Sequence, residues 1–214
     1  MNDLLFMVAD TNMREALGGF LERQAVHQII GCRAIDFDAR RDIKVAKGQN
    51  DPGLFTRANE LLRPFSGTYR HAVVVVDEEW DGSPGAAVIQ SQLDGHLTNV
   101  GWGPPDGLSL VVQPEVDNWL WSDSPHSATA LGWPSWEELR PALQSNGWIE
   151  GEAPKPARPK EAAEWALRHG AGNAKRSASL YRKVASSVSL RRCVDPAVDV
   201  LLNALRRWFP VEGA

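Results

Sequence analysis

HAVVVVD, residues 71–77, is the stretch that decides the fold: four consecutive valines run directly into Asp77. β-Branched residues favour extended backbone, and a strand that is apolar on both faces is typical of a parallel sheet covered by helices on two sides. Apolar runs at residues 4–9 and 108–112 predict two more strands, with stretches of helical period between them. The sequence therefore predicts an α/β fold with a mainly parallel, four-stranded sheet flanked by helices.

Three further elements complete this α/β pattern. A weaker strand is expected within residues 26–37. A helix is expected to open at Asp51-Pro52 and to end before Arg63-Pro64, since proline is tolerated in the first turn and stops a helix later on. Pro84 suits the start of another helix, which precedes the glycine- and proline-rich loop at residues 101–107. Strands and helices that alternate in this way indicate a parallel sheet.

The chain beyond residue 113 is predicted to be helical. Ser135 and Glu138 form a capping box. Further helices are expected over residues 159–169, 175–188 and 195–208. Pro154, Pro156 and Pro159, which lie before and at the start of the first of these helices, mark a linker. We predict an α/β domain over residues 1–150, a proline-rich linker over residues 151–159 and a basic helical extension over residues 160–214.

Charge is distributed unevenly along the chain. Residues 1–154 contain 11 basic and 22 acidic residues, a net charge of −11, whereas residues 155–214 contain 12 basic and 5 acidic residues, a net charge of +7. A basic surface of this kind suits a nucleic-acid backbone, an acidic partner protein or the acidic half of the same chain, and composition does not choose among them. The candidate nucleic-acid-binding residues are Lys160, Lys175, Arg176, Arg182, Lys183, Arg191 and Arg192.

Several classes of protein are disfavoured by the sequence. No run approaches the roughly 20 apolar residues of a membrane-spanning helix, and the N-terminus does not resemble a signal peptide. Cys32 and Cys193 form neither a CxxC pair nor a disulfide framework, which suits a reducing compartment. No P-loop, HExxH or GxSxG motif is present. We expect a cytoplasmic protein without a membrane partner.

Acidic residues follow three of the predicted strands. They are Asp10, Asp77, Glu79, Glu115 and Asp117. The carboxyl ends of parallel strands lie at one edge of a sheet, and residues 71–139 contain 11 acidic residues but no Lys or Arg. Two like charges about 4 Å apart repel by roughly 4 kcal/mol at an effective dielectric constant near 20. Such a cluster needs a cation, a basic partner or a shared proton, and Mg²⁺ or Mn²⁺ suits carboxylate ligands beside a phosphate.

Three motifs resemble those of TOPRIM domains, the metal-binding folds of topoisomerases, primases and nucleases. They are the apolar strand and acid at residues 4–10, VVVDEE at residues 74–79 and QPEVDNWL at residues 113–120. Together with PKE at residues 159–161 and SLY at residues 179–181, they are similar to bacterial TOPRIM-related proteins encoded beside phage-defence genes, including components of methylation-associated defence systems. The resemblance covers most of the chain and implies a Rossmann-like sheet.

The same resemblance implies roles for individual residues. Asp77 and Glu79 would bind Mg²⁺, Glu115 would complete or orient the site with Asp117 beside it, and Asp10 would act as a ligand or general base. Each acid also has a structural alternative. Asp10 is open to a role at a helix N-terminus, Asp77 and Glu79 to a solvated loop, and Glu115 and Asp117 to capping of the following helix.

Two functions follow from the resemblance. The first is a Mg²⁺-dependent nuclease or other phosphoryl-transfer protein that acts on nucleic acid in antiphage defence, with other defence-system proteins as partners. The second is a catalytically degenerate TOPRIM-like scaffold that binds the partner proteins of a defence complex. Two departures from the family favour the scaffold: Ala9 stands at the position of the family's first glutamate, and Glu79 replaces the second aspartate of its Asp-x-Asp motif.

Overall fold

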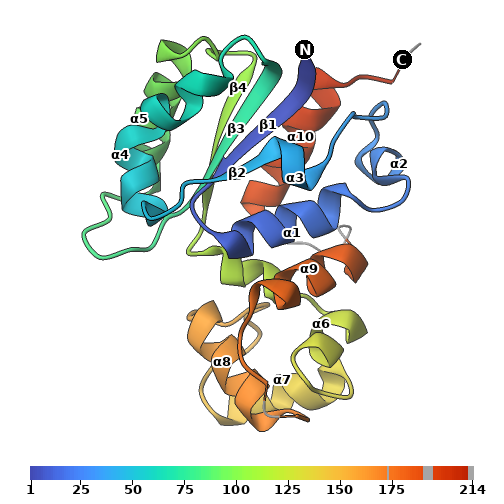
Figure 1. Cartoon of the computed structure of the whole chain (residues 1–214). Coiled ribbons are helices and arrows are strands. Elements are labelled where there is room, and N and C mark those ends of the chain that lie inside the picture. The colour runs from blue at the N-terminus through green and yellow to red at the C-terminus, as the bar shows by residue number, and fades with distance from the viewer. Residues whose placement is uncertain (173, 190–194, 212–214) are drawn as a thin grey trace.

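The computed structural model describes residues 1–172, 174–189 and 195–211. The strands are β1 (Asn2–Val8), β2 (Ile43–Val45), β3 (Tyr69–Asp77) and β4 (Gly107–Val112). They form one sheet in the order β2-β1-β3-β4, in which every neighbouring pair is parallel (Figure 1). The predicted α/β fold class is confirmed.

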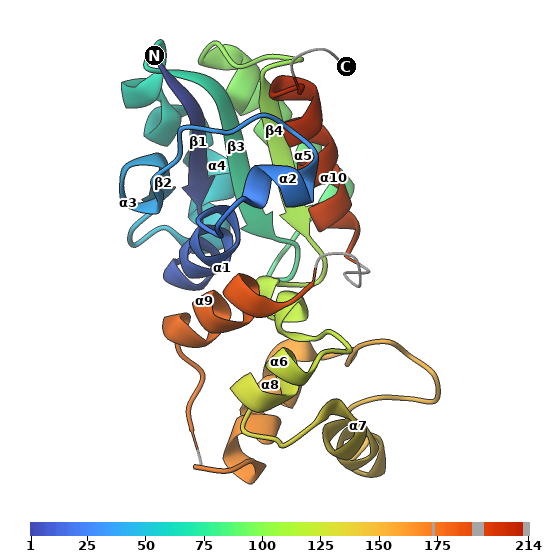
Figure 2. The ribbon, with the colours of Figure 1, turned by 90° about the vertical axis from the view of Figure 1, so that its right-hand side faces the viewer.

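Helices cover both faces of this sheet. The described α-helices are α1 (Thr11–Leu21), α2 (Val26–Ile30), α3 (Ala39–Asp42), α4 (Asn50–Leu62), α5 (Ala86–Asn99), α6 (Pro125–Ala130), α7 (Trp136–Ser145), α8 (Pro159–His169), α9 (Ala178–Ser187) and α10 (Pro196–Trp208). The short 3₁₀ helices are η1 (Arg63–Phe65) and η2 (Val116–Leu120). α4 and α5 lie on one face, and α1 and α10 lie on the other (Figures 1 and 2). The four valines of β3 are therefore fully buried, as a strand covered on both faces requires.

The second strand lies outside the stretch in which it was predicted. Residues 26–37 contain α2, which ends at Gly31 with a φ of 83°, a conformation that glycine adopts readily. The strand is β2, which pairs with β1 through Phe6 opposite Ile43 and Val8 opposite Val45. With only three residues, β2 is too short for an apolar period to appear in the sequence. The prediction of a strand within residues 26–37 is wrong for this reason.

The helices that follow β4 lie in two parts of the molecule. α6, α7 and α8 form a helical unit below the sheet, and the chain then returns so that α9 packs on α1 and α10 packs on β4 (Figures 1 and 2). The predicted cap of α7 is confirmed, because Glu138 N donates to Ser135 Oγ at 3.3 Å. The helical unit thus takes α6 and α7 from before the predicted linker and α8 from after it. Among the described helices, none is long and apolar enough to cross a membrane.

Gly19→Ala is expected to destabilise the protein because α9 crosses α1 at this position. A Cβ at Gly19 would lie 2.7 Å from the carbonyl oxygen of Arg182 and 3.0 Å from its Cα. These are backbone atoms, so α9 would have to move, and overpacking of this kind typically costs about 1–3 kcal/mol. The matched control is Gly95→Ala on the exposed side of α5, where a Cβ meets no atom within 4 Å. The control is expected to gain roughly 0.5–1 kcal/mol. Urea unfolding measures both, and equal effects would contradict the close approach.

Candidate functional site

Asp10, Asp51 and Asp77 lie at the C-terminal edge of the sheet, and each accepts a backbone hydrogen bond through its Oδ1. Asp10 caps α1, because it accepts a hydrogen bond from Met13 N at 2.8 Å. Asp51, in the first turn of α4, accepts one from Asp77 N at 2.8 Å. Asp77 in turn accepts one from Val116 N at 2.7 Å. These bonds join the start of α4 and the start of η2 to the end of β3.

The pKa values of Asp51 and Asp77 are raised. Burial raises the pKa of Asp51 to about 6, and the charge of Asp10 adds to this effect. Burial also raises the pKa of Asp77 well above its ordinary range. Asp51 is the next largest contributor, followed by Asp10 and Glu115. Within the described part of the chain, no Lys or Arg forms an ion pair with Asp10, Asp51 or Asp77. The carboxylates repel one another when they are ionised, so the cluster favours the binding of a cation or of protons.

Glu115 connects these acids to the helical unit. Burial, together with the charge of Asp117, raises its pKa to about 7, and Lys160 opposes this rise. Glu115 Oε1 accepts a hydrogen bond from Lys160 N at 3.2 Å, so it caps the first turn of α8. The residue at the N-cap of α8, Arg158, makes no side-chain cap of its own. The predicted structural alternative, in which Glu115 caps a helix that follows it, is confirmed for α8, while its side chain makes no cap on η2. We call Asp10, Asp51, Asp77 and Glu115 the acidic edge.

Asp117 belongs to a neighbouring buried network. It is 2% exposed, and it accepts hydrogen bonds from Tyr181 Oη at 2.6 Å and from Arg176 Nη1 at 3.0 and 3.2 Å. Arg176 also donates to Tyr181 Oη at 2.7 Å and lies 3.6 Å from Glu164. Burial raises the pKa of Asp117, while Tyr181 and Arg176 oppose the rise. This network fastens α9 and the residues before it to η2.

Glu78 and Glu79, which follow Asp77 on the chain, differ in their exposure to solvent. Glu79 is exposed, and its backbone N–H donates to Pro114 O at 3.0 Å. Glu78 is partly buried and accepts hydrogen bonds from Ala86 N and from Gln113 Nε2, both at 3.0 Å. Glu78 therefore ties β3 to the start of α5. The structure gathers Asp10, Asp77 and Glu115 and leaves Glu79 at the surface.

Asp51 is the member of the acidic edge that the sequence analysis did not select. The Asp51-Pro52 pair was interpreted only as the start of a helix, and that helix does begin there, at Asn50. The residue also follows β2 on the chain, so a correct position for β2 would have placed it at the same edge as Asp10 and Asp77. The misplaced strand therefore concealed this carboxylate.

The basic extension is partly engaged within the chain. Arg182 Nε lies 2.8 Å from Glu15 Oε2, and its Nη1 lies 3.0 Å from Glu22 Oε2. Arg176 is paired with Asp117. The exposed candidates are Lys160, Lys175 and Lys183. Arg191 and Arg192 lie outside the described residues, as does Cys193. The acidic half of the chain thus accounts for part of the basic charge, which was one of the three predicted alternatives.

The acids present suit a hard divalent cation in donor type and charge. One oxygen each of Asp10 and Asp77 accepts a backbone hydrogen bond, and the other oxygen receives none from any described residue. In the described ranges, no three Asp, Glu, His or Cys side chains are already arranged around a cation position. Mg²⁺ is commonly held by one or two carboxylates together with waters and substrate phosphates. Asp10 and Asp77 therefore match the expected ion in donor type and charge.

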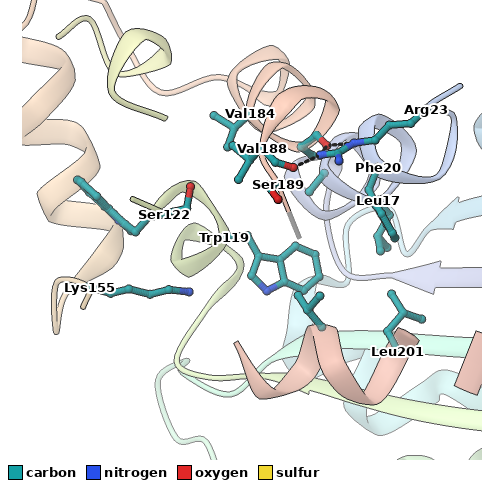
Figure 3. Close-up of a pocket in the computed structure, with 14 residues that line it drawn as sticks. Leu17, Phe20, Arg23, Trp119, Ser122, Lys155, Val184, Val188, Ser189 and Leu201 are labelled. Carbon is teal, nitrogen blue, oxygen red and sulfur yellow. Dashed lines mark hydrogen bonds between the residues drawn. The ribbon is translucent and has the colours of Figure 1, made fainter. Parts of the chain in front are cut away.

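An apolar cavity of about 70 Å³ lies between α1, η2, α9 and α10 (Figure 3). Its lining includes Leu17, Phe20, Trp119, Val184 and Leu201. Trp119 Nε1 is buried and has no hydrogen-bond partner among the described residues. At the cavity wall, Arg23 donates to Ala185 O and Val188 O, which holds α1 to the end of α9. The N-caps of α1 and η2 are Asp10 and Glu115, so the cavity and the acidic edge share two elements.

The chain matches no protein-family model, no curated protein and no solved structure. The resemblance to TOPRIM-related proteins stays a prediction.

Proposed function

We propose that the acidic edge binds Mg²⁺ or Mn²⁺ and that the protein acts on the phosphate groups of nucleic acid, as a nuclease or another phosphoryl-transfer protein of bacterial antiphage defence. The observation that carries this proposal is the gathering of Asp10, Asp51, Asp77 and Glu115 at one edge of the sheet, where their charges and burial act together to raise the pKa of Asp77. The predicted resemblance supplies the antiphage context and the class of substrate.

Each residue of the edge has a defined task in this proposal. Asp10 and Asp77 offer a carboxylate oxygen to the ion, and their other oxygens hold α1 and η2 in place. Asp51 fixes the end of β3 through Asp77 N. A bound Mg²⁺ would stabilise negative charge on a phosphate and lower the pKa of a water. Lys160, whose charge acts on Glu115 and Asp117, lies where it would attract the phosphate of a strand.

Asp77→Asn tests this function. Stabilisation by a metal ion is worth several kcal/mol, and about 1.4 kcal/mol corresponds to a tenfold change in rate. Cleavage of single- and double-stranded DNA and RNA with Mg²⁺ or Mn²⁺ is therefore expected to fall roughly a hundredfold or more. The matched control is Asp81→Asn, an exposed acid in the same loop, which should cleave like the wild type. Undiminished cleavage by a folded Asp77→Asn protein would refute the assignment.

A scaffold without catalysis is the second candidate. The exposed position of Glu79 and the absence, within the described residues, of three acids arranged around a cation position favour it. In this case the acidic edge and the basic extension are docking surfaces for other defence proteins. Isothermal titration of Mg²⁺ then gives no binding heat, and co-purification from a strain that carries the neighbouring defence genes recovers a stable partner. Saturable Mg²⁺ binding that Asp77→Asn abolishes would exclude this candidate.

A further inference from the structure

The helical unit carries a series of stacked aromatic rings along α8. Trp165 and His169 lie one turn apart on this helix, and their rings stack with centroids 4.6 Å apart and planes inclined by 24°. Trp133 stacks on Trp165 at 6.0 Å and 22°, and Trp148 packs on it at 6.5 Å and 44°. The three tryptophans are partly buried, whereas His169 is exposed. The series therefore ends at an imidazole ring on the surface.

The ring of His169 is held in a fixed orientation. Its Nδ1 lies 2.8 Å from the carbonyl oxygen of Trp165, and because a carbonyl oxygen only accepts, Nδ1 is the donor. One face of the ring lies against Trp165, and no second ring of the described residues stacks on it. A ring that is already ordered loses less conformational entropy when a ligand binds to it. His169 is thus a preorganised surface for another planar group.

Unpaired cations lie on the same helix and just after its end. Lys160, Arg168 and Lys175 are exposed, and among the described residues no carboxylate forms an ion pair with any of them. A hollow of about 430 Å³ lies between α8 and the segment before α9. Its lining residues are Glu164, Arg168, Ala174, Lys175 and Arg176. Two of the three unpaired cations therefore line one hollow, which suits an anionic group.

Cations beside a stacking ring are the combination by which proteins bind single-stranded nucleic acid. Lys and Arg contact the phosphates, and an aromatic ring stacks on a base. Residues 158–176 contain five basic and two acidic residues, a net charge of +3, which attracts any polyanion. The ring of His169 favours nucleic acid over an acidic protein, because every base offers it a flat face. It also favours a single strand, because the bases of a duplex are stacked on one another and do not reach a surface ring.

The position of α8 connects this surface to the acidic edge. The helical unit lies beyond the C-terminal ends of the strands (Figures 1 and 2). Lys160 N donates to Glu115 Oε1 at 3.2 Å, and His169 follows nine residues later, about 14 Å along the helix. A nucleic-acid strand that extends along α8 from His169 therefore leads to the acidic edge.

We propose that the exposed face of α8 binds single-stranded nucleic acid. An unpaired base stacks on the free face of His169, and phosphates of the same strand contact Arg168, Lys175 and Lys160. This inference rests on the proposed function for the presence of nucleic acid, and it adds the form of the substrate and the surface that holds it. The contact involves no metal ion, so binding should occur in EDTA and should weaken as the salt concentration rises.

Fluorescence anisotropy with labelled single strands of DNA and RNA in EDTA tests the stacking. The wild type should bind a single strand more tightly than a duplex, and more tightly than an abasic strand, which has the phosphates without the bases. His169→Ala should weaken binding of the intact strand roughly fivefold or more, as expected for one stacked base, and leave binding of the abasic strand unchanged. His169→Phe keeps a flat ring and should retain most of the affinity.

His126→Ala is the matched control for the ring. His126 is exposed on α6 of the same helical unit, and it stacks on no ring of a described residue. Its replacement should leave binding unchanged. Lys175→Gln tests the phosphate contacts: it should weaken binding of the intact and the abasic strand alike and reduce the salt dependence by about one phosphate contact.

Three results would overturn the proposal. They are an absence of binding up to about 100 µM protein, equal affinities for the intact strand, the abasic strand and the duplex, and an effect of His126→Ala as large as that of His169→Ala. Asp77→Asn separates this inference from the proposed function, because it should bind the strand in EDTA as the wild type does. A wild type that binds the strand in this way but does not cleave it with Mg²⁺ or Mn²⁺ contradicts the proposed function alone. Cleavage of a strand that His169→Ala binds normally contradicts this inference alone.

Discussion

Asp77→Asn is expected to be more stable than the wild type in the absence of metal, and its advantage should grow as the pH rises from about 4 to about 7. The folded state raises the pKa of Asp77, so the folded wild type binds more protons than the unfolded chain in this range. Stability contributed by such a group is present at low pH and is lost as the pH rises towards the folded pKa. The asparagine keeps an oxygen for Val116 N and carries no charge.

The expected size of this effect follows from Asp51, whose pKa rises from 3.8 to about 6. A difference of that order between the folded and unfolded states corresponds to roughly 3 kcal/mol of lost stability once the group is ionised. The pKa of Asp77 is shifted in the same direction, so the variant should be more stable than the wild type at pH 7. Urea unfolding of both proteins across this pH range measures the difference.

The informative quantity is the difference in the free energy of unfolding between Asp77→Asn and the wild type. Asp3 and Glu15 have lowered pKa values and contribute stability of the opposite pH dependence. These contributions cancel when the variant is compared with the wild type. Asp81→Asn, in the exposed part of the same loop, should show no advantage at any pH. An advantage of Asp77→Asn that shrinks as the pH rises would contradict the raised pKa. Saturating Mg²⁺ should stabilise the wild type and leave the variant unchanged.

Arg176→Gln is expected to cost about 3 kcal/mol of stability at pH 7, because removal of one partner of a buried ion pair leaves an unpaired charge. The charge is Asp117, which is 2% exposed and, among the described residues, would keep the hydroxyl of Tyr181 as its one side-chain hydrogen-bond donor. Burial raises the pKa of Asp117, and loss of Arg176 raises it further. Protonation then relieves the unpaired charge as the pH falls, so the cost should be smaller at pH 5 than at pH 7.

Two further variants separate the charge from the shape of the side chain. Asp117→Asn combined with Arg176→Gln removes both charges and should recover part of the loss. Lys175→Gln, at the neighbouring exposed position, should change stability by less than about 0.5 kcal/mol. Thermal or urea unfolding measures all four proteins. An Arg176→Gln cost that is equal at pH 5 and pH 7 would show that Asp117 does not carry the effect.

The central strands were predictable because runs of apolar residues in the local sequence indicate their burial. The valines of β3 and the apolar runs of β1 and β4 needed no knowledge of distant contacts. β2 lacked this property, since its three residues are specified by pairing with β1. The cap at Ser135 was also local, and it is confirmed.

The acidic edge was predictable in part for the same reason. Asp10, Asp77 and Glu115 were found from strand ends alone, because parallel strands share an edge. The exposure of Glu79 and the attachment of Glu115 to α8 depend on contacts between segments far apart in the chain. The pairing of Arg182 with Glu15 was foreseen only as one of three uses for the basic charge. Composition predicts the sign of the net charge of a surface, and the fold determines which opposite charges lie beside it.

Glu115 has a consequence for communication between the two parts of the molecule. One oxygen of this side chain holds the first turn of α8, and the same carboxylate stands among the acids that raise the pKa of Asp77. A ligand that draws Glu115 towards the edge of the sheet takes an acceptor from α8, and a partner that moves α8 releases Glu115 towards the ligand. Linkage requires the two effects to be equal in free energy. Under the proposed function, the affinity of the acidic edge for a cation and any affinity of the helical unit for a partner would therefore be coupled.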